Sequence, residues 1–377
     1  MISQKITSEQ LFEAEKILSS LDRFVILTHM SPDGDAMGSS LAMYHYLHSL
    51  GKEATVIVPN AFPSFLAWMP GAQDDVIYEA DREKADSILD HTQAIIVTDL
   101  HEIKRLGALG DKVMSLLSER PDMPLMMIDH HIVLRQDPEL VSRPDYLLIS
   151  YPDSPSASEL IYRLITSLST FVFERQRSFV FERSGLSTDI ATAIYTGMMT
   201  DTGNFSFNSN YPEMYEIVGE LVRAGVDKDA VYNAVFNQYS EYRMRLMGYC
   251  LYQKMRIFPE YHTALIFLSG RELYRFHFQP GDAEGIVNLP LQIGDIYYSC
   301  FMREDKLAPH EVAVANGAKK KIKISFRSQG DRPVNTFAAD YFHGGGHKNA
   351  AGGEFYGPLT EAVQTFLTHY PEYFKKD

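Results

Sequence analysis

The sequence predicts an α/β protein: an N-terminal, mostly parallel sheet with helices on both faces, followed by a smaller C-terminal α/β domain. Two observations predict this architecture. Short apolar runs that fit buried strands alternate with segments of helical periodicity in the N-terminal part. Further along, residues 262–268, 296–302 and 321–327 have the composition of strands in a second, smaller sheet. We expect the active site in a cleft between the two domains.

Each N-terminal element follows from its apolar spacing and its boundary residues. Residues 8–20 carry an apolar stripe at helical spacing and predict a helix. The turn at 32–34 and the glycines that follow two of the helices mark boundaries. The other expected elements are strands at 24–27, 54–58, 94–98, 124–128 and 146–149, and helices at 37–50, 156–168, 188–200 and 212–224.

The domain boundaries are expected where this alternation ends. Residues 229–256 have a polar and aromatic helical pattern that we interpret as a connector. This predicts a first domain at 1–228 and a second at 257–377, with a final helix at about 359–368. A chain of 377 residues is long enough to bury two separate cores.

Composition and charge exclude several classes of protein. Cys250 and Cys300 are the two cysteines, and they predict neither a disulfide framework nor a zinc site, which is typical of a reducing cytoplasm. No run approaches the roughly 18 apolar residues of a membrane helix, and the N-terminus is not a signal peptide. The net charge of −14 argues against a broad basic face for long duplex nucleic acid, but not against a short anionic substrate.

Acidic and imidazole side chains follow several of the predicted buried strands. His29, Asp33 and Asp35 follow the first strand, Asp99 follows the run 94–98, and the tripeptide 129–131 follows the run 124–128. Asp201 ends a helical pattern. The carboxyl ends of parallel strands meet in one crevice, where so many carboxylates would repel each other unless cations held them. We therefore expect a pair of divalent metal ions.

These segments resemble the four motifs of the DHH phosphoesterase superfamily in order and spacing. The motifs are His29-x3-Asp33-x-Asp35, Asp99, Asp129-His130-His131 and Asp201. A fifth segment, 344–352, resembles the signature of the DHH-associated C-terminal domain. The resemblance covers about residues 20 to 355 and is strongest to the stand-alone nanoRNase/pAp-phosphatase group.

The resemblance implies a ligand set for the two ions. His29 and Asp33 are implied to hold the first ion, and Asp35, His130 and Asp201 the second, with Asp99 as the bridge. Asp33 and Asp35 lie two residues apart on a turn that opens a helix, so each can serve a different ion. Mixed imidazole and carboxylate ligands favour Mn²⁺ over calcium, with Mg²⁺ as the alternative.

The other two residues of the tripeptide are expected to act beside the metals. Asp129 can accept the free ring N–H of a metal-bound imidazole. The family pattern implies that His131 faces the substrate phosphate, where it would donate to a phosphoryl oxygen or protonate the leaving group. We thus expect His131, Asp99 and Asp129 as the catalytic group.

The C-terminal domain contributes the expected substrate-binding residues. Gly344, Gly345 and Gly346 can place backbone N–H groups against an anion because no side chains intervene, and His347 adds a donor. Arg327 and Ser328 follow a strand where related proteins present an arginine to a terminal phosphate or similar anion. Arginine offers a bidentate fork for that contact.

The resemblance implies an Mn²⁺-dependent hydrolase of very short RNA and of the 3′-phosphate of pAp. A cyclic or linear dinucleotide phosphodiesterase of the same superfamily is the alternative, and a non-catalytic nucleotide-binding protein is a distant one. The expected partners are a short RNA or nucleotide and a second copy of the chain, without long duplex nucleic acid or membrane. The expected location is the cytoplasm.

A few residues stand outside these motifs. His45, His48, His91 and His101 are interpreted as surface or packing residues. Capping explains Glu159 at a helix start, with support of the metal ligands as the alternative. The near-repeat at 171–184 is interpreted as an insertion that forms a local hairpin or helix extension or packs against a partner subunit.

Overall fold

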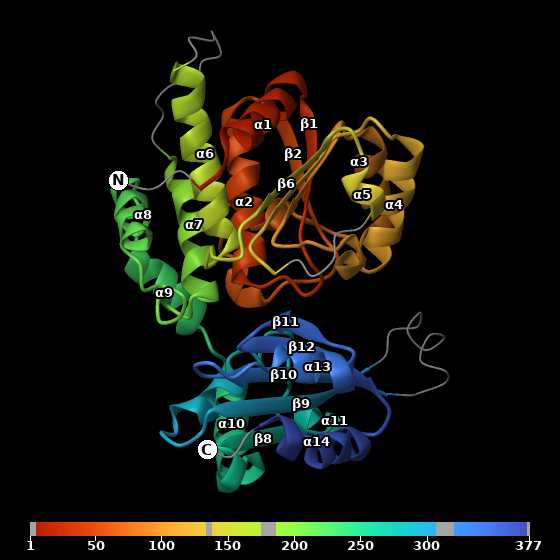
Figure 1. The fold of residues 1–377 in the computed structure, drawn as a ribbon, viewed down its shortest axis with the longest axis vertical. Helices are drawn as coiled ribbons and strands as arrows, with labels where there is room; N and C mark the ends of the chain where they lie inside the picture. Colours follow the sequence, from red (N-terminus) through yellow and green to blue (C-terminus); the bar gives the residue numbers. More distant parts are fainter. Residues whose placement is uncertain (1–4, 133–137, 175–185, 307–319, 375–377) are drawn as a thin grey trace. The chain divides into compact units, whose positions relative to one another are not determined.

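The computed structural model describes residues 5–132, 138–174, 186–306 and 320–374, and these form two compact units (Figure 1). The first unit is Met1–Gln238 and the second is Tyr239–Asp377. This division falls inside the range 229–256 that the sequence suggested as a connector. Most of the near-repeat at 171–184 lies outside the described residues.

The first unit is built on a six-stranded sheet in which every neighbouring pair of strands is parallel. The strand order is β3-β2-β1-β4-β5-β6. The strands are β1 (Arg23–Leu27), β2 (Glu53–Val58), β3 (Val76–Ile77), β4 (Ala94–Thr98), β5 (Leu125–Asp129) and β6 (Tyr146–Ser150). The expected parallel sheet is confirmed.

Both faces of this sheet are buried, because successive side chains of each strand point to opposite sides. In β1, Ile26 packs into one hydrophobic core, whereas Val25 and Leu27 pack into another. Helices α1, α2, α6 and α7 cover the first of these faces, and α3 and α4 cover the second (Figure 1). Because both faces are buried, the central strands are continuous runs of apolar residues.

The helices of the first unit mostly begin at residues with good capping chemistry. Thr7, for example, caps α1 through a reciprocal pair of hydrogen bonds with Gln10. The helices are α1 (Ser8–Ser20), α2 (Gly34–Ser49), α3 (Arg82–His91), α4 (Ala108–Glu119), α5 (Pro138–Val141), α6 (Ala157–Glu174), α7 (Thr188–Asp201), α8 (Pro212–Arg223) and α9 (Lys228–Phe236). Short 3-10 turns are η1 (Ser64–Leu66), η2 (Ala72–Asp74) and η3 (Ile103–Leu106).

The order of the strands places a switch point between β1 and β4. The chain proceeds from β1 outward through β2 and β3, then returns to the other side of β1 with β4. In open parallel sheets, ligands bind in the crevice at the carboxyl ends of the strands where this reversal occurs. His29 and Asp99 follow these two strands directly.

Two glycines let helices α2 and α7 cross at close range. A side chain at Gly38 would meet the backbone of Ala193 and Gly197, at distances as short as 2.6 Å. A side chain at Gly197 would meet Asp35 Oδ1 at 2.8 Å. The close crossing brings the N-terminal turn of α2, with Asp35, next to the C-terminal part of α7.

The second unit contains a mixed six-stranded sheet of order β11-β12-β10-β9-β8-β7. Only the β8–β9 pair is parallel among the described strands of this sheet. The strands are β7 (Arg256–Phe258), β8 (Thr263–Leu268), β9 (Tyr298–Lys306), β10 (Lys320–Ser328), β11 (Gly345–His347) and β12 (Ala350–Tyr356). The expected second sheet is confirmed, but it is not smaller than the first, because both have six strands.

Helices cover this sheet on both faces. The helical elements are α10 (Glu241–Tyr249), the π-helical turn η4 (Cys250–Lys254), η5 (Pro259–Tyr261), α11 (Gly270–Arg275), η6 (Ile286–Gln292), α13 (Asn335–Phe342) and α14 (Leu359–Tyr373). One core includes Cys300 with residues of α13 and α14, and the other includes Cys250 with residues of α11 and η6. Both thiols are free and buried.

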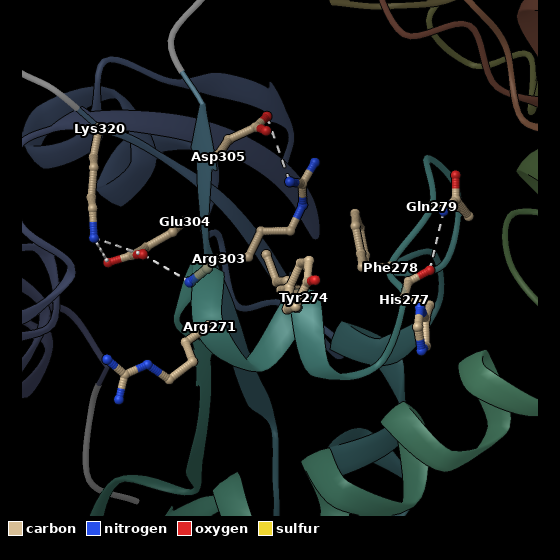
Figure 2. A pocket seen from close by; sticks show the side chains of 11 residues that line it. Arg271, Tyr274, His277, Phe278, Gln279, Arg303, Glu304, Asp305 and Lys320 are labelled. Carbon is tan, nitrogen blue, oxygen red and sulfur yellow. Dashed lines mark hydrogen bonds and ion pairs between the residues drawn. The ribbon is translucent and has the colours of Figure 1, made fainter.

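The second unit also has a cavity of about 730 Å³ beside α11 (Figure 2). Its lining includes Arg303, Glu304 and Lys320. Lys320 pairs with Glu304 at 3.0 Å, and Arg303 lies 3.5 Å from Asp305. These charged groups are therefore paired with one another.

None of the helices in the described part of the chain has the length and apolar character needed to cross a membrane.

Candidate active site

The first cluster of candidate ligands is His29, Asp33 and Asp99. One ligand atom from each lies within 4.8 Å of the others. His29 Nδ1 donates to the carbonyl of Met30 at 3.0 Å, because a carbonyl can only accept. The opposite ring atom, Nε2, therefore faces Oδ2 of Asp99 at 3.2 Å and Oδ1 of Asp33 at 3.9 Å.

Asp33 is held by the helix that it begins. It is the N-cap of α2, and its Oδ1 accepts from the backbone N–H groups of Asp35 and Ala36 at 3.0 and 3.1 Å. The side chain is half exposed. The capping contacts orient the carboxylate but leave oxygen lone pairs for a further partner.

The second cluster is Asp35, His130 and Asp201, again with one ligand atom from each within 4.8 Å of the others. His130 Nε2 lies 3.4 Å from Asp201 Oδ2 and 3.8 Å from Asp35 Oδ2. The other nitrogen, Nδ1, donates to the carbonyl of Ser154 at 3.2 Å, which fixes the ring. Asp201 is the last residue of α7.

Asp35 receives support from a different helix. Its two carboxylate oxygens accept from the first N–H groups of α6, those of Ala157 at 2.6 Å and Ser158 at 2.9 Å. A helix N-terminus is a favourable place for a carboxylate because its N–H groups have no partners within the helix. Asp35 is nevertheless fully buried, so its charge still needs compensation.

Asp99 lies between the two clusters. Its Oδ2 faces His29, whereas its Oδ1 lies 3.4 Å from Nε2 of His130. Oδ1 is buried and has no hydrogen-bond partner among the described residues. Asp99 also has a φ of +56°, a left-handed conformation that aspartate tolerates better than most residues and that is often found at functional sites.

The pKa values of these groups are shifted by burial and by their charged neighbours. Burial and the nearby Asp99 charge raise the pKa of Asp35 to about 7. Burial also raises the pKa of Asp201, with the charge of Asp35 adding to it. Burial lowers the pKa of His29, but the Asp99 carboxylate outweighs this effect and raises it to about 9. Without a cation, His29, Asp35 and Asp201 therefore keep their protons to higher pH than they would in water.

The donor set fits divalent cations. Asp33, Asp35, Asp99 and Asp201 carry four negative charges, which would balance two dications with neutral imidazoles. The buried, unpartnered Oδ1 of Asp99 and the raised carboxylate pKa values are what a cation would relieve. Structural clustering therefore agrees with divalent metal binding.

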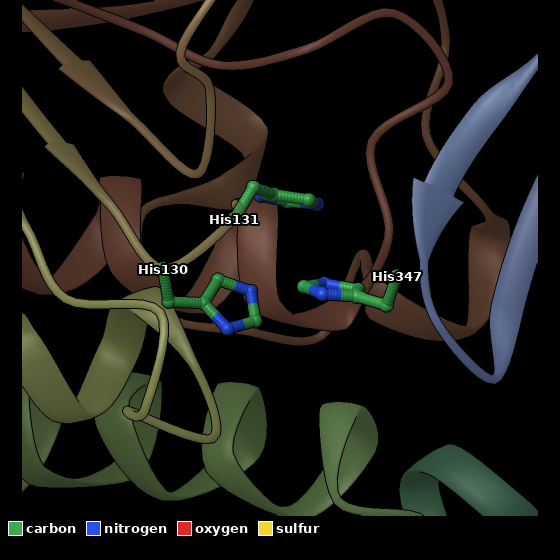
Figure 3. Close-up of side chains that lie close together, drawn as sticks. All are labelled: His130, His131 and His347. Carbon is green, nitrogen blue, oxygen red and sulfur yellow. The ribbon is translucent and has the colours of Figure 1, made fainter. Parts of the chain in front are cut away.

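His131 and Asp129 form a pair beside the clusters. Asp129 Oδ1 accepts from Nδ1 of His131 at 2.7 Å. The ring centroids of His130 and His131 lie 4.8 Å apart, with an angle of 61° between the ring planes. Figure 3 shows both rings. His347, which the same figure labels, belongs to the second unit.

The expected contact of Asp129 with a metal-bound imidazole is corrected by this geometry. Nδ1 of His130 donates to Ser154, so Asp129 does not support that ring. Asp129 and His131 contact each other, whereas the ring of His130 turns to the carbonyl of Ser154. The pair that forms is therefore Asp129 with His131.

His101 makes a contact beside the clusters that the sequence interpretation did not anticipate. It was expected to be a surface or packing residue, but its Nδ1 lies 3.2 Å from Oδ2 of Asp129. Its position two residues after Asp99 was the available signal. By contrast, His45, His48 and His91 contact backbone carbonyls of Pro70, Ala54 and Ser87.

Glu159 is fully buried, and its carboxylate does not cap α6. Ser156 Oγ accepts from the backbone N–H of Glu159, while the Glu159 carboxylate pairs with Arg163 at 2.6 Å and accepts from the hydroxyl of Tyr211. The Glu159 carboxylate therefore links α6 to Tyr211, the residue before α8. The expected capping role is wrong for this side chain.

In the second unit the register of the sheet gathers the expected substrate-binding residues. Arg327 of β10 is opposite Ala350 of β12, and Ala350 is opposite His347 of β11. Residues directly opposite each other share a face of a sheet, so Arg327 and His347 lie in one row. Gly345 and Gly346 belong to the same edge strand as His347, and Gly344 precedes it.

Arg327 and Ser328 are also tied to their own strand and loop. Arg327 Nη1 donates to the carbonyl of Phe326 at 2.9 Å. Ser328 Oγ donates to the carbonyl of Arg332 and accepts from Asn349 at 2.8 Å. The hydroxyl of Ser328 thus braces the loop that follows β10.

Comparisons with known proteins agree with this fold. The sequence model "DHH family, N-terminal domain" matches residues 23–198. A crystal structure of an exopolyphosphatase-related protein from Bacteroides fragilis is 40% identical, with a TM-score of 0.82 over 98% of both chains. The fold and the clustered carboxylates and imidazoles define a phosphoesterase, a hydrolase. The chain belongs to the DHH family.

Curated relatives match over almost the whole chain. The bifunctional oligoribonuclease and PAP phosphatase NrnA of Thermus thermophilus is 27% identical, over 91% of this chain and 90% of the relative. The protein of the same name from Bacillus subtilis is 24% identical, over 91% of this chain and 93% of the relative.

Proposed function

We propose that the chain is a Mn²⁺-dependent phosphoesterase that hydrolyses very short oligoribonucleotides and removes the 3′-phosphate of pAp by two-metal-ion hydrolysis. The observation that carries this proposal is the convergence of four distant segments into the two clusters, with Asp99 between them. Two-metal hydrolases need two groups of ligands and a carboxylate that can bridge them. The relatives named as oligoribonuclease and PAP phosphatase support the choice of substrate.

The ligand set supports Mn²⁺ as the ion. Each cluster combines one imidazole with two carboxylates, a mixture that suits Mn²⁺ better than calcium, while Mg²⁺ remains the alternative. In this proposal His29 and Asp33 hold one ion, Asp35, His130 and Asp201 hold the other, and Asp99 bridges. Such ions, when bound, lower the pKa of water and stabilise charge on phosphoryl oxygens.

The chain's own residues orient the reacting groups. Asp129 accepts from Nδ1 of His131, which orients the ring. In the proposal, Nε2 donates to a phosphoryl oxygen or to the leaving oxygen. Ser154 and Met30 fix the rings of His130 and His29 through their carbonyls. These contacts orient the rings before a substrate binds.

The second unit supplies a place for a second anionic group. Arg327 and His347 share one row of the sheet, next to the backbone of Gly345 and Gly346. In the proposal they bind a phosphate other than the reacting one, which short RNA and pAp both have. Such a contact favours nucleotides over simple phosphate esters.

A substrate panel tests the proposal. Purified protein with Mn²⁺ is incubated with pAp, a 5′-labelled diribonucleotide, a 24-mer RNA, cyclic di-AMP and polyphosphate, and initial rates are compared. We expect pAp and the dinucleotide to be hydrolysed much faster than the 24-mer. A preference for cyclic di-AMP would favour the dinucleotide phosphodiesterase alternative. A preference for polyphosphate would instead follow the description of the Bacteroides fragilis protein.

A further inference from the structure

His101 makes a contact at the edge of the site that the proposed chemistry has not used. Its Nδ1 lies 3.2 Å from Oδ2 of Asp129. Both atoms are buried, and neither makes a hydrogen bond of regular geometry with any of the described residues. Because an unpaired buried polar atom is costly, these two atoms are each other's natural partners.

The carboxylate of Asp129 therefore lies between two imidazoles. Its Oδ1 accepts from His131 at 2.7 Å while its Oδ2 faces His101, and the two rings are 5.6 Å apart. The carboxylate is fully buried, and its two oxygens face ring nitrogens of different histidines. A carboxylate oxygen accepts in such a contact, so each imidazole presents an N–H to it.

The placement of His101 depends on the turn after β4. The left-handed backbone at Asp99 turns the chain directly after the strand. Asp99 then faces the two clusters of candidate ligands, while His101, two residues further on, contacts the carboxylate of Asp129 at the end of β5. The same turn therefore positions a candidate ligand and a support for the neighbouring strand end.

A carboxylate with both oxygens engaged cannot rotate freely about its Cβ–Cγ bond. Without His101, Oδ2 would be left without a partner, and the carboxylate could turn away from the direction that receives His131. His131 would then lose the 2.7 Å contact that fixes its tautomer, because the contact of the same nitrogen with Oδ1 of Asp99 is longer, at 3.5 Å. The other contact of His101, with Glu102 Oε1, is long at 3.9 Å and offers little alternative restraint.

We propose that His101 is a positioning residue for the phosphoesterase reaction, which acts through Asp129 to fix the orientation and tautomer of His131. The inference rests on the proposed role of His131 at the substrate phosphate. It assigns no metal ion to His101.

A double-mutant cycle tests this chain of contacts. The variants are His101→Ala, His131→Ala and the double variant, with pAp and bis-p-nitrophenyl phosphate as substrates at saturating Mn²⁺. Loss of a partner that orients a functional side chain typically costs about 10–100-fold, and we expect His101→Ala to lower kcat by this factor with KM changed less than about 3-fold. In the His131→Ala background the further loss should be below about 3-fold, because the effect passes through His131.

Two more variants separate positioning from folding. His101→Asn keeps an N–H donor near Oδ2 of Asp129 and should recover kcat to within about 5-fold of the wild type, whereas a residue needed only for its volume would not be rescued in this way. His91→Ala is the matched control, because His91 is an exposed histidine of the same unit whose ring donates to the carbonyl of Ser87. Mn²⁺ binding is measured for every variant by electron paramagnetic resonance.

Three results would overturn the positioning role of His101. Equal losses from His101→Ala in the wild-type and His131→Ala backgrounds would overturn the proposal, as would an undiminished kcat. A fall in the number of bound Mn²⁺ ions would also overturn it, because His101 would then support the metals. If the wild type hydrolyses bis-p-nitrophenyl phosphate but not pAp, the proposed substrate fails while the cycle on the first substrate still decides the role of His101.

Discussion

Replacing Asp99 by asparagine should be the most damaging conservative change in the site. Asp99 is 2% exposed and faces His29 at 3.2 Å and His130 at 3.4 Å, one from each cluster. Asparagine keeps the shape and also tolerates the left-handed backbone at this position, so the fold should survive. What is lost is the negative charge and one of the two oxygen ligands.

The size of the effect follows from the bridging position. A hydrogen bond or ligand contact to a charged group contributes about 2 kcal/mol, which corresponds to a roughly 30-fold weaker affinity at each ion. Because Asp99 is proposed to contact both ions, the product of the two affinities should fall by about 10³-fold. Hydrolysis of pAp at limiting Mn²⁺ should fall in parallel.

The assay is an Mn²⁺ titration followed by electron paramagnetic resonance, together with initial rates on pAp. Asp90→Asn is the matched control, because Asp90 is an aspartate of the same unit that pairs with Lys112 at 2.7 Å, with half of its side chain exposed. If Asp99→Asn bound Mn²⁺ within about 3-fold of the wild type and kept near-normal rates, Asp99 would not be the bridge.

Three further predictions concern pH, recognition and assembly. His29 and Asp35 have raised pKa values in the folded protein, about 9 and about 7, so both bind protons more tightly when folded and their stabilisation is lost as the pH rises. The Tm of the metal-free protein, measured by calorimetry, should therefore fall between pH 6 and pH 9, by about 4–8 °C for a loss of about 2 kcal/mol in the free energy of unfolding. The increase in Tm on adding Mn²⁺ should become larger over the same pH range. A Tm of the metal-free protein that stays flat or rises with pH would contradict this prediction. Arg327→Ala should lower kcat/KM for pAp by about 30- to 1000-fold, but much less for bis-p-nitrophenyl phosphate, and equal losses on both substrates would refute a role in binding the distal phosphate. The chain is also predicted to form a homodimer, and a monomer mass in light scattering at micromolar concentration would refute that prediction.

Sequence reasoning predicted the first sheet and the convergence of its strand-end residues because the physical signals were local. Asp99 and the tripeptide at 129–131 follow buried apolar strands directly, and parallel strands share one carboxyl edge. The row formed by Arg327 and His347 was not predictable in this detail. It depends on the register of β10, β12 and β11, and glycine-rich strands have a weak β signal.

The contacts that support the site were not accessible from the sequence because they join elements far apart in the chain. The N–H groups that hold Asp35 come from the start of α6, more than a hundred residues away. The approach of α2 to α7 depends on Gly38 and Gly197 meeting at one crossing. His101 was missed for the same reason, since its partner Asp129 belongs to the neighbouring strand.

The helical pattern at 229–256 did not predict where the helices in this range begin and end. Residues 229–256 have a continuous helical pattern, but the structure divides them into α9, α10 and the π-helical turn η4. Helix α9 ends at Phe236, and Ser240 caps the start of α10 through the N–H of Arg243. A capping serine in the middle of a polar helical pattern was the signal that a boundary lies there.

The most direct test of the central claim is a crystal structure of the Mn²⁺-loaded protein with anomalous diffraction at the manganese edge. The account predicts two anomalous peaks, one bound by His29 and Asp33 and the other by Asp35, His130 and Asp201, with Asp99 contacting both ions. Two-metal hydrolases place such ions about 3.5–4 Å apart. A single peak, or peaks outside these two clusters, would contradict the account.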